Sequence, residues 1–181
     1  MKNTTIKTFT VVAVTVFLLN HCAIAQSIAF GPYENDEPVM LTHSNVNNGD
    51  EKKSSDVSGS IHPRATENFQ KAFKGITGER WVTNNEGYFA SFIKDSVYTR
   101  VDYNKNGRWL ETIRYYNEKK LPGEVHYMIK KGYTDYSILG VAEVSFDDDP
   151  VYMVYIQDGI YIKMIGVYQA EMTEIESHKR L

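Results

Sequence analysis

The chain has 181 residues, with 20 Lys and Arg against 23 Asp and Glu and a formal net charge of −3. A mildly acidic chain offers no basic surface of the kind that attracts nucleic acids or anionic membranes, so we expect neither as a partner. This length suits one globular domain together with an N-terminal targeting segment.

Residues 1–25 have the three parts of a secretory signal peptide. Lys2 and Lys7 come first without any acid, an apolar run follows at 11–19, and the triplet at 23–25 reads Ala-Ile-Ala. The apolar run is much shorter than the roughly 20 residues that a membrane-spanning helix needs. We therefore expect cleavage near Ala25, a periplasmic or secreted product, and no membrane insertion after cleavage.

The only cysteine, Cys22, lies inside this segment. A lipoprotein is the minor alternative, because His21 stands where a lipidated cysteine needs a small residue. Cleavage leaves no thiol, which excludes disulfides, a cysteine nucleophile and thiolate metal sites from the mature chain. Loss of Lys2 and Lys7 also moves the formal net charge from −3 to −5.

Residues 26–62 are rich in Ser, Asn, Asp, Glu and Gly, with few hydrophobic residues. Such a composition cannot bury enough apolar surface to offset the entropy of ordering, so we predict a disordered polar spacer. The folded domain is expected at 63–177, followed by a short tail at 178–181.

The folded domain contains two similar units, at about 63–117 and 118–177, and each begins with a short amphipathic helix. In the first helix Thr66 is the expected cap and Gly75 with Gly78 the expected end. The second is expected to start at Leu121-Pro122 and to close at Gly132. The apolar positions of the two helices are Phe69, Ala72, Phe73 and Ile76, then Val125, Met128 and Ile129.

After each helix the hydrophobic period falls to two, and β-branched and aromatic residues dominate, which indicates strands. The predicted strands are 79–83, 88–94, 97–103 and 109–116 in the first unit, and 137–146, 151–157, 160–166 and 169–176 in the second. The segment from Phe89 to Arg100 also aligns with the segment from Tyr152 to Lys163 at one constant offset. This self-similarity predicts two tandem copies of one unit.

The hairpin turns assign side chains to faces. A two-residue loop at Asp158-Gly159 sets Tyr155 opposite Ile162, and Asp95-Ser96 is treated alike. One face of the second unit then carries no charge, so we expect helices to cover it. The residues expected to face the helices are Tyr88, Ala90, Phe92, Val97, Thr99 and Val101, and Val151, Met153, Tyr155, Ile160, Ile162 and Met164.

The opposite face mixes charges with aromatic residues, and Arg100 is expected directly across from Glu111. Tyr, Trp and Arg are enriched at interface hot spots, so we predict that a partner binds here. An alternative is that these aromatics simply favour strands and pack under a loop or a neighbouring chain. The predicted partner-binding residues are Phe89, Tyr98, Arg100, Trp109, Glu111, Tyr152, Tyr161 and Lys163.

Metal-binding and catalytic motifs are weak. The run Asp102-x-Asn104-x-Asn106-Gly107 matches the first half of a calcium loop, but Ile113 stands where the bidentate acid belongs. A β-turn explains the run better. The acids at 147–149 are typical of a solvated loop. Nucleophile-elbow, phosphate-loop and His-Glu-x-x-His patterns do not occur, so we predict no catalytic residues, cofactor or metal.

Several motifs together resemble the PepSY-like and β-lactamase-inhibitor-protein-like (BLIP-like) exported proteins of Bacteroidetes. They are Asn68-Phe69-x-x-Ala72-Phe73, Trp81, Gly87-Tyr88-Phe89, Asp-x-Asn-x-Asn-Gly-x-Trp-Leu from Asp102, Leu121-Pro122 and Lys-Lys-Gly-Tyr from Lys130. The resemblance spans nearly all of 63–177. It implies an α+β fold in which the two tandem helix-plus-four-strand repeats form one antiparallel sheet, with helices on one face and an open concave face.

The sequence thus predicts an exported, non-enzymatic binding or inhibitory module, whose partner is an unknown protein or peptide of the cell envelope. Two alternatives stay open. One is an envelope hydrolase or metal-dependent activity that uses scattered acids such as Asp102, Glu111 and Asp148. The other is a structural accessory subunit that pairs through a free sheet edge.

Overall fold

The structure is a computed structural model that describes residues 28–30, 40–42, 61–146 and 149–180. The expected signal peptide and cleavage site, most of the expected spacer, and Asp148 lie outside the described residues. Two short strands are described within the expected spacer, β1 (Ile28–Phe30) and β2 (Met40–Thr42). They pair antiparallel with Ile28 opposite Thr42 and Phe30 opposite Met40.

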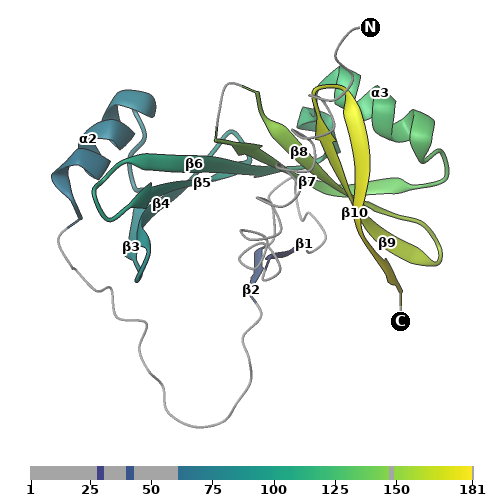
Figure 1. Cartoon of the computed structure of the whole chain (residues 1–181), viewed down its shortest axis with the longest axis horizontal. Coiled ribbons are helices and arrows are strands. Elements are labelled where there is room, and N and C mark those ends of the chain that lie inside the picture. Colours follow the sequence, from purple (N-terminus) through teal and green to yellow (C-terminus); the bar gives the residue numbers. More distant parts are fainter. Residues whose placement is uncertain (1–27, 31–39, 43–60, 147–148, 181) are drawn as a thin grey trace, which may run out of the picture.

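The other eight strands form one antiparallel sheet in the order β10-β9-β8-β7-β6-β5-β4-β3, so every strand pairs with its neighbour in sequence (Figure 1). The strands are β3 (Arg80–Thr83), β4 (Gly87–Lys94), β5 (Val97–Asn104), β6 (Trp109–Tyr116), β7 (Ser137–Ser145), β8 (Val151–Gln157), β9 (Tyr161–Tyr168) and β10 (Glu171–Lys179). All eight predicted strands are confirmed, with ends that differ by a few residues.

Within the described residues, two α-helices and a 3₁₀ turn accompany the sheet. Helix α2 (Pro63–Ala72) is capped by His62, whose Nδ1 accepts a hydrogen bond from the Arg64 N–H at 3.2 Å. The predicted cap at Thr66 was wrong: Pro63 supplies the favourable first helical position, and the Thr66 hydroxyl donates to the Pro63 carbonyl. The turn η1 (Glu118–Lys120) leads into α3 (Gly123–Gly132).

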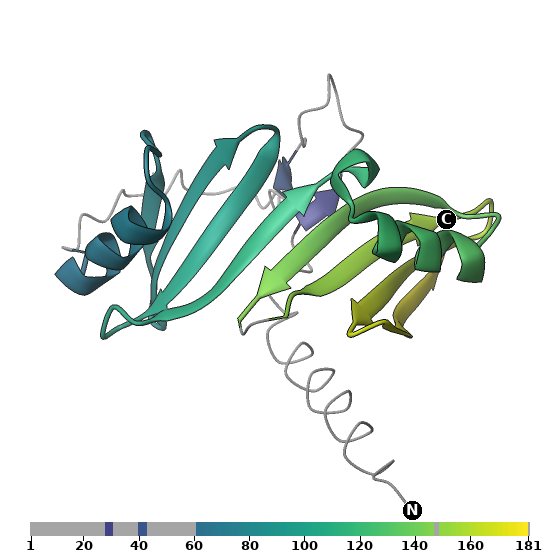
Figure 2. The same ribbon diagram turned by 90° about the horizontal axis from the view of Figure 1, so that it is seen from above.

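Both helices pack on the same side of the sheet, as Figures 1 and 2 show. The strand register agrees, because it places residues of both helix cores on one face of the sheet. Val101 of the α2 core is opposite Thr112 on β6. Arg114 and Tyr116 continue the same face of β6 and are opposite Glu143 and Val141, the latter in the α3 core. We call this side the helix face, and the other, over which the structure describes no helix, the helix-free face. The α+β class with one antiparallel sheet is confirmed. The tandem duplication stays a prediction.

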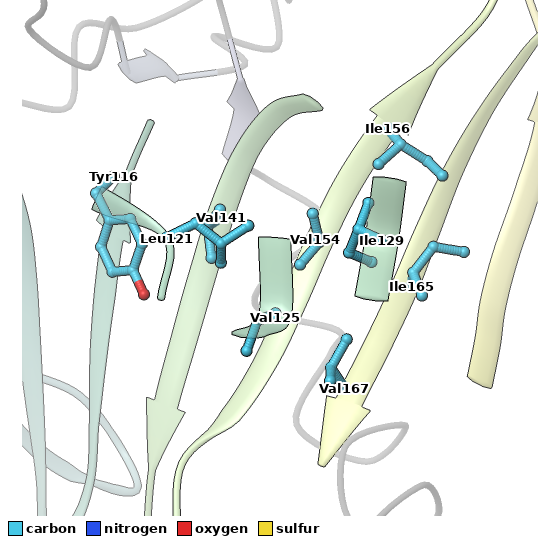
Figure 3. Close-up of a cluster of buried hydrophobic side chains, with 9 residues drawn as sticks. All are labelled: Tyr116, Leu121, Val125, Ile129, Val141, Val154, Ile156, Ile165 and Val167. Carbon is cyan, nitrogen blue, oxygen red and sulfur yellow. The ribbon is translucent and has the colours of Figure 1, made fainter. Parts of the chain in front are cut away.

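The α3 half has a core of aliphatic side chains, shown in Figure 3. Val125 and Ile129 descend from the helix onto strand residues that are fully or almost fully buried. These strand residues are Tyr116, Val141, Val154, Ile156, Ile165 and Val167. Burying aliphatic side chains stabilises by about 1.5–3 kcal/mol each, so this cluster holds α3 on β7, β8 and β9.

The α2 half has an aromatic core. The ring of Phe69 lies 5.4 Å from Trp81 and 5.7 Å from Phe92, both in edge-on arrangements. Phe73 adds a third ring 5.3 Å from Phe92. Edge-to-face pairs add stability beyond burial of area, so these four aromatic rings fix the short helix α2 on β3 and β4.

The faces of β4 and β5 are predicted correctly, but those of β8 and β9 in the second half were wrong. Val154, Ile156 and Ile165 face α3, whereas Met153 and Met164 lie on the helix-free face. The prediction assigned the charge-free side to the helices. The charged Lys163 is tolerated on the helix face because its stem lies at the rim of the core while its ammonium reaches Glu174 at 2.7 Å.

The two hairpin turns also differ. Asp95 and Ser96 both have positive φ, 52° and 57°, and Lys94 pairs with Val97, so the predicted two-residue loop is confirmed. In the second hairpin, each β8 residue pairs with a β9 residue two positions later than predicted. Gln157 is opposite Ile162, and Tyr155 is opposite Met164 instead of Ile162. The Asp158 carboxylate explains the wider turn, since it accepts from the N–H groups of Ile160 and Tyr161.

Candidate functional site

The eight predicted partner-binding residues divide evenly between the two faces. The helix-free face carries Phe89, Tyr98, Arg100 and Glu111, which lie on β4, β5 and β6. The other four residues lie on the helix face or its rim: Trp109, Tyr152, Tyr161 and Lys163. The structure therefore brings together only the four residues of the first unit.

Trp109 changes face because a β-bulge interrupts the β5–β6 pairing between Asp102 and Tyr103. Trp109 pairs with Tyr103, and its indole N–H donates to the Thr112 hydroxyl at 3.0 Å. Thr112 is buried on the helix face. The bulge also sets Arg100 opposite Ile113 and Asp102 opposite Glu111, so the predicted Arg100–Glu111 pairing was wrong.

The residues of the second unit serve the fold around α3. Tyr152 packs against the α3 core, and burial is the main cause that raises its pKa. The Lys163 ammonium lies 5.8 Å from the rings of Tyr133, Tyr136 and Tyr161. Tyr161 is 40% exposed at the beginning of β9. Lys163 and Tyr161 thus line the rim of the α3 core.

Arg100 organises the helix-free face of the first unit. Its Nε donates to the Asp102 carboxylate at 2.8 Å, and both side chains are only 14% exposed. Its guanidinium also lies over the Phe89 ring, 4.3 Å from the centroid. A guanidinium that is both stacked and paired loses its rotational freedom, so Arg100 presents a fixed positive surface.

Asp102 has a perturbed carboxyl group. Burial is the largest cause and raises its pKa above the ordinary value of 3.8, while the Arg100 charge and the Glu111 side chain act in the opposite direction. Asp102 and Glu111 are opposite each other in the β5–β6 register. Two adjacent carboxyl groups near one guanidinium leave a net negative charge at this end of the sheet when both are ionised.

These residues line a cavity of about 240 Å³. Its lining includes Phe89, Arg100, Asp102 and Glu111, together with Glu86 and Leu110, which the sequence analysis did not select. Leu110 is 49% exposed. Its exposure follows from the bulge, and a sequence pattern of strict alternation gives no signal for it. We call Phe89, Tyr98, Arg100, Asp102, Leu110 and Glu111 the β4–β6 patch.

The calcium-loop match has a structural role instead. The Asn104 side-chain oxygen accepts from the N–H groups of Asn106 and Arg108, both at 3.0 Å. Gly107 at φ 69° completes the turn. Among the described residues, no three His, Cys, Asp or Glu side chains gather as metal ligands would. The same part of the chain contains no helix with the length and apolarity of a membrane span.

Comparison with known proteins relates the chain to solved structures alone, since no family model and no curated protein matches it. A DUF2874 family protein from Bacteroides ovatus is 16% identical, with a TM-score of 0.56 over 66% of this chain and 88% of that one. A BLIP-like protein from Bacteroides fragilis is 17% identical, with a TM-score of 0.53 over 66% and 85%. A Bacteroides eggerthii protein provisionally described as periplasmic is 16% identical, with a TM-score of 0.54 over 67% and 90%.

At these identities the likeness concerns the fold. The BLIP-like fold of Bacteroides proteins is supported, whereas none of these matches supports the PepSY-like part of the resemblance.

Proposed function

We propose that this chain is an exported, non-enzymatic binding module that receives a protein or peptide partner on the β4–β6 patch. The observation that carries the proposal is the arrangement of Arg100, which is held by Asp102 and stacked on Phe89 beside a cavity on the helix-free face. The structural neighbours provisionally described as periplasmic and as BLIP-like agree with export and with this fold.

The patch has the composition of an interface centre. Rigid aromatic and Arg side chains bind at low entropic cost, and Phe89, Tyr98 and Arg100 are of this type. Leu110 and Ile93 lie beside them, 49% and 55% exposed. Exposed apolar residues around a fixed charge favour burial by a partner.

The charge of the cavity indicates what the partner contributes. Glu86, Asp102 and Glu111 surround it against the one cation of Arg100. Its apolar lining includes Phe89 and Leu110. A Lys or Arg side chain has an apolar stem and a charged head, so we propose that a basic side chain of the partner enters this cavity.

Site-specific photo-cross-linking in the native envelope tests the proposal. A photoreactive residue replaces Tyr98 in one strain and Tyr127 in another, because Tyr127 is 64% exposed on α3 and thus on the helix face. We expect one discrete adduct from position 98 and not from position 127. Equal adducts from both positions would show that the β4–β6 patch is not the binding surface.

A charge variant tests the chemistry of the cavity. Glu111→Lys is expected to abolish the position-98 adduct, while Glu124→Lys, which changes the same charge on α3, leaves it intact. If Glu111→Lys forms the adduct as well as the parent chain does, the basic side chain does not enter this cavity.

One observation favours a second candidate, a hydrolase. Asp102 and Glu111 are opposed carboxyl groups in one cavity, and burial raises the Asp102 pKa, which suits a general acid. Asp102→Asn and Glu111→Gln discriminate the two functions. A hydrolase loses turnover of envelope glycans or peptides in both variants, whereas a binding module shows no turnover in the parent chain either.

A further inference from the structure

The helix-free face contains six side chains that are buried although no described helix covers them. They are Tyr115, Ala142, Val144, Val151, Met153 and Met164, each at most 4% exposed. We call them the central cluster. Burial also raises the pKa of the Tyr115 phenol well above its ordinary value of 10.0.

The sheet itself does not explain this burial. On the same face, at the β4–β6 end, Ile93 and Leu110 remain 55% and 49% exposed. Side chains on one uncovered sheet layer keep their tips in solvent, because neighbours on the same face stand beside them and not above them. The central cluster is thus more deeply buried than the β4–β6 end of the same face, which a segment lying over the cluster alone would explain.

The β1–β2 pair is in the right place. Figures 1 and 2 both show it on the helix-free side, near the middle of the sheet. Its two strands read Ile-Ala-Phe and Met-Leu-Thr, which are apolar runs within an otherwise polar segment. Residues 43–60 can span up to about 60 Å at 3.3 Å per residue, so a pair placed there can connect to the beginning of α2.

We infer that the β1–β2 pair docks on the central cluster as a permanent part of the fold, so that the mature N-terminal segment of this chain covers its own sheet. The inference goes beyond the proposed function, and it restricts where a partner binds. The docked pair occupies the middle of the helix-free face and leaves the β4–β6 patch accessible.

Methionine oxidation tests the docking, because the chain carries internal references. In the full mature chain, hydrogen peroxide is expected to oxidise Met172, which is 37% exposed, much faster than Met153 and Met164. The double variant Phe30→Asp, Leu41→Asp should accelerate oxidation of Met153 and Met164 roughly tenfold, as loss of local protection does. Met128 packs on the helix face and should not change.

The control variant Ser44→Asp, Ser54→Asp adds the same charge outside both strands and should oxidise like the parent chain. Unchanged oxidation of Met153 and Met164 in the Phe30, Leu41 variant would overturn the inference. Acceleration of Met128 in parallel would mean general unfolding, and the next experiment then decides.

Photo-cross-linking needs no destabilising change. A photoreactive phenylalanine analogue at position 30 is expected to label Met153, Met164 or their strands β8 and β9 within one chain. Mixing isotopically light and heavy chains distinguishes the possible occupants. Adducts between light and heavy chains would show that a second copy covers the cluster, and adducts elsewhere on the sheet would show that the pair docks at another site. Both results overturn the inference.

Discussion

The guanidinium of Arg100 lies 4.3 Å from the centre of the Phe89 ring while its Nε donates to Asp102 at 2.8 Å. One side chain thus connects the aromatic and the acidic parts of the β4–β6 patch. Because Arg100 and Asp102 are both largely buried, the pair contributes to the fold as well as to the surface that the partner contacts.

Arg100→Ala should destabilise the chain by roughly 1–3 kcal/mol, because it leaves the Asp102 carboxylate buried without its partner. Urea unfolding at neutral pH measures the loss. The double variant Arg100→Ala, Asp102→Asn should recover part of the stability, since it leaves no unpaired charge. A double variant that is less stable than Arg100→Ala would contradict this reading of the pair.

The Asp102 carboxyl should make stability fall as the pH rises. Its folded pKa lies above the ordinary value of 3.8, so the folded chain holds this proton more tightly than the unfolded chain. The stability that protonation contributes is present below pH 3.8 and is lost as the pH rises through the folded pKa. Asp102→Asn should therefore gain stability relative to the parent chain across that window, measured by urea unfolding at a series of pH values.

Asp158 provides a control of opposite sign. Hydrogen bonds from the Tyr161 and Ile160 N–H groups hold its pKa below 3.8. Its contribution is present above pH 3.8 and is lost as the pH falls through the lowered folded pKa. Asp158→Asn should lose stability relative to the parent chain as the pH rises. If stability depended on pH in the same way in both variants, the raised pKa of Asp102 and the lowered pKa of Asp158 would be refuted.

Local sequence patterns were enough to predict the helices and strands of this fold. They were not enough to predict which face of the sheet each helix covers. The two periodicities, together with Asp95-Ser96, were enough for the strands and the first hairpin. They did not decide which face α3 covers, because Met153 and Met164 are as apolar as Val154 and Ile165. A sheet that is covered on both faces carries apolar side chains on both, so the hydrophobic pattern does not distinguish the helix face from the helix-free face.

Only half of the predicted partner-binding residues lie together on the helix-free face, and the reason is related. Strict alternation placed Phe89, Tyr98 and Arg100 correctly up to the bulge at Asp102. The bulge adds one residue on β6 and reverses the side-chain direction between Glu111 and Trp109, so Trp109 was assigned to the wrong face and Leu110 was missed. No residue type between Asp102 and Leu110 signals the bulge in advance.

Gly107 should tolerate no side chain. Its φ is 69°, and a Cβ at this position would lie 2.8 Å from the Ala65 nitrogen and 2.9 Å from His62 Nδ1. Gly107→Ala should cost more than the roughly 1–2 kcal/mol of a left-handed alanine alone. Gly78→Ala is the matched control, since φ is 81° there and nothing lies within 4 Å. Equal losses in thermal unfolding would contradict the close packing of α2 on the β5–β6 turn.

The assignment of α3 to its face of the sheet can be tested with two variants of that helix. Ile129 is 1% exposed among Val154, Ile156 and Ile165, and Tyr127 on the same helix is 64% exposed. Ile129→Ala should lose about 2–5 kcal/mol of unfolding free energy through lost burial and the cavity left behind. Tyr127→Ala should change it by less than about 0.5 kcal/mol, as surface substitutions do. If Met153→Ala, rather than Ile129→Ala, lowered the protection of α3 amides in hydrogen exchange, the helix would cover the opposite face.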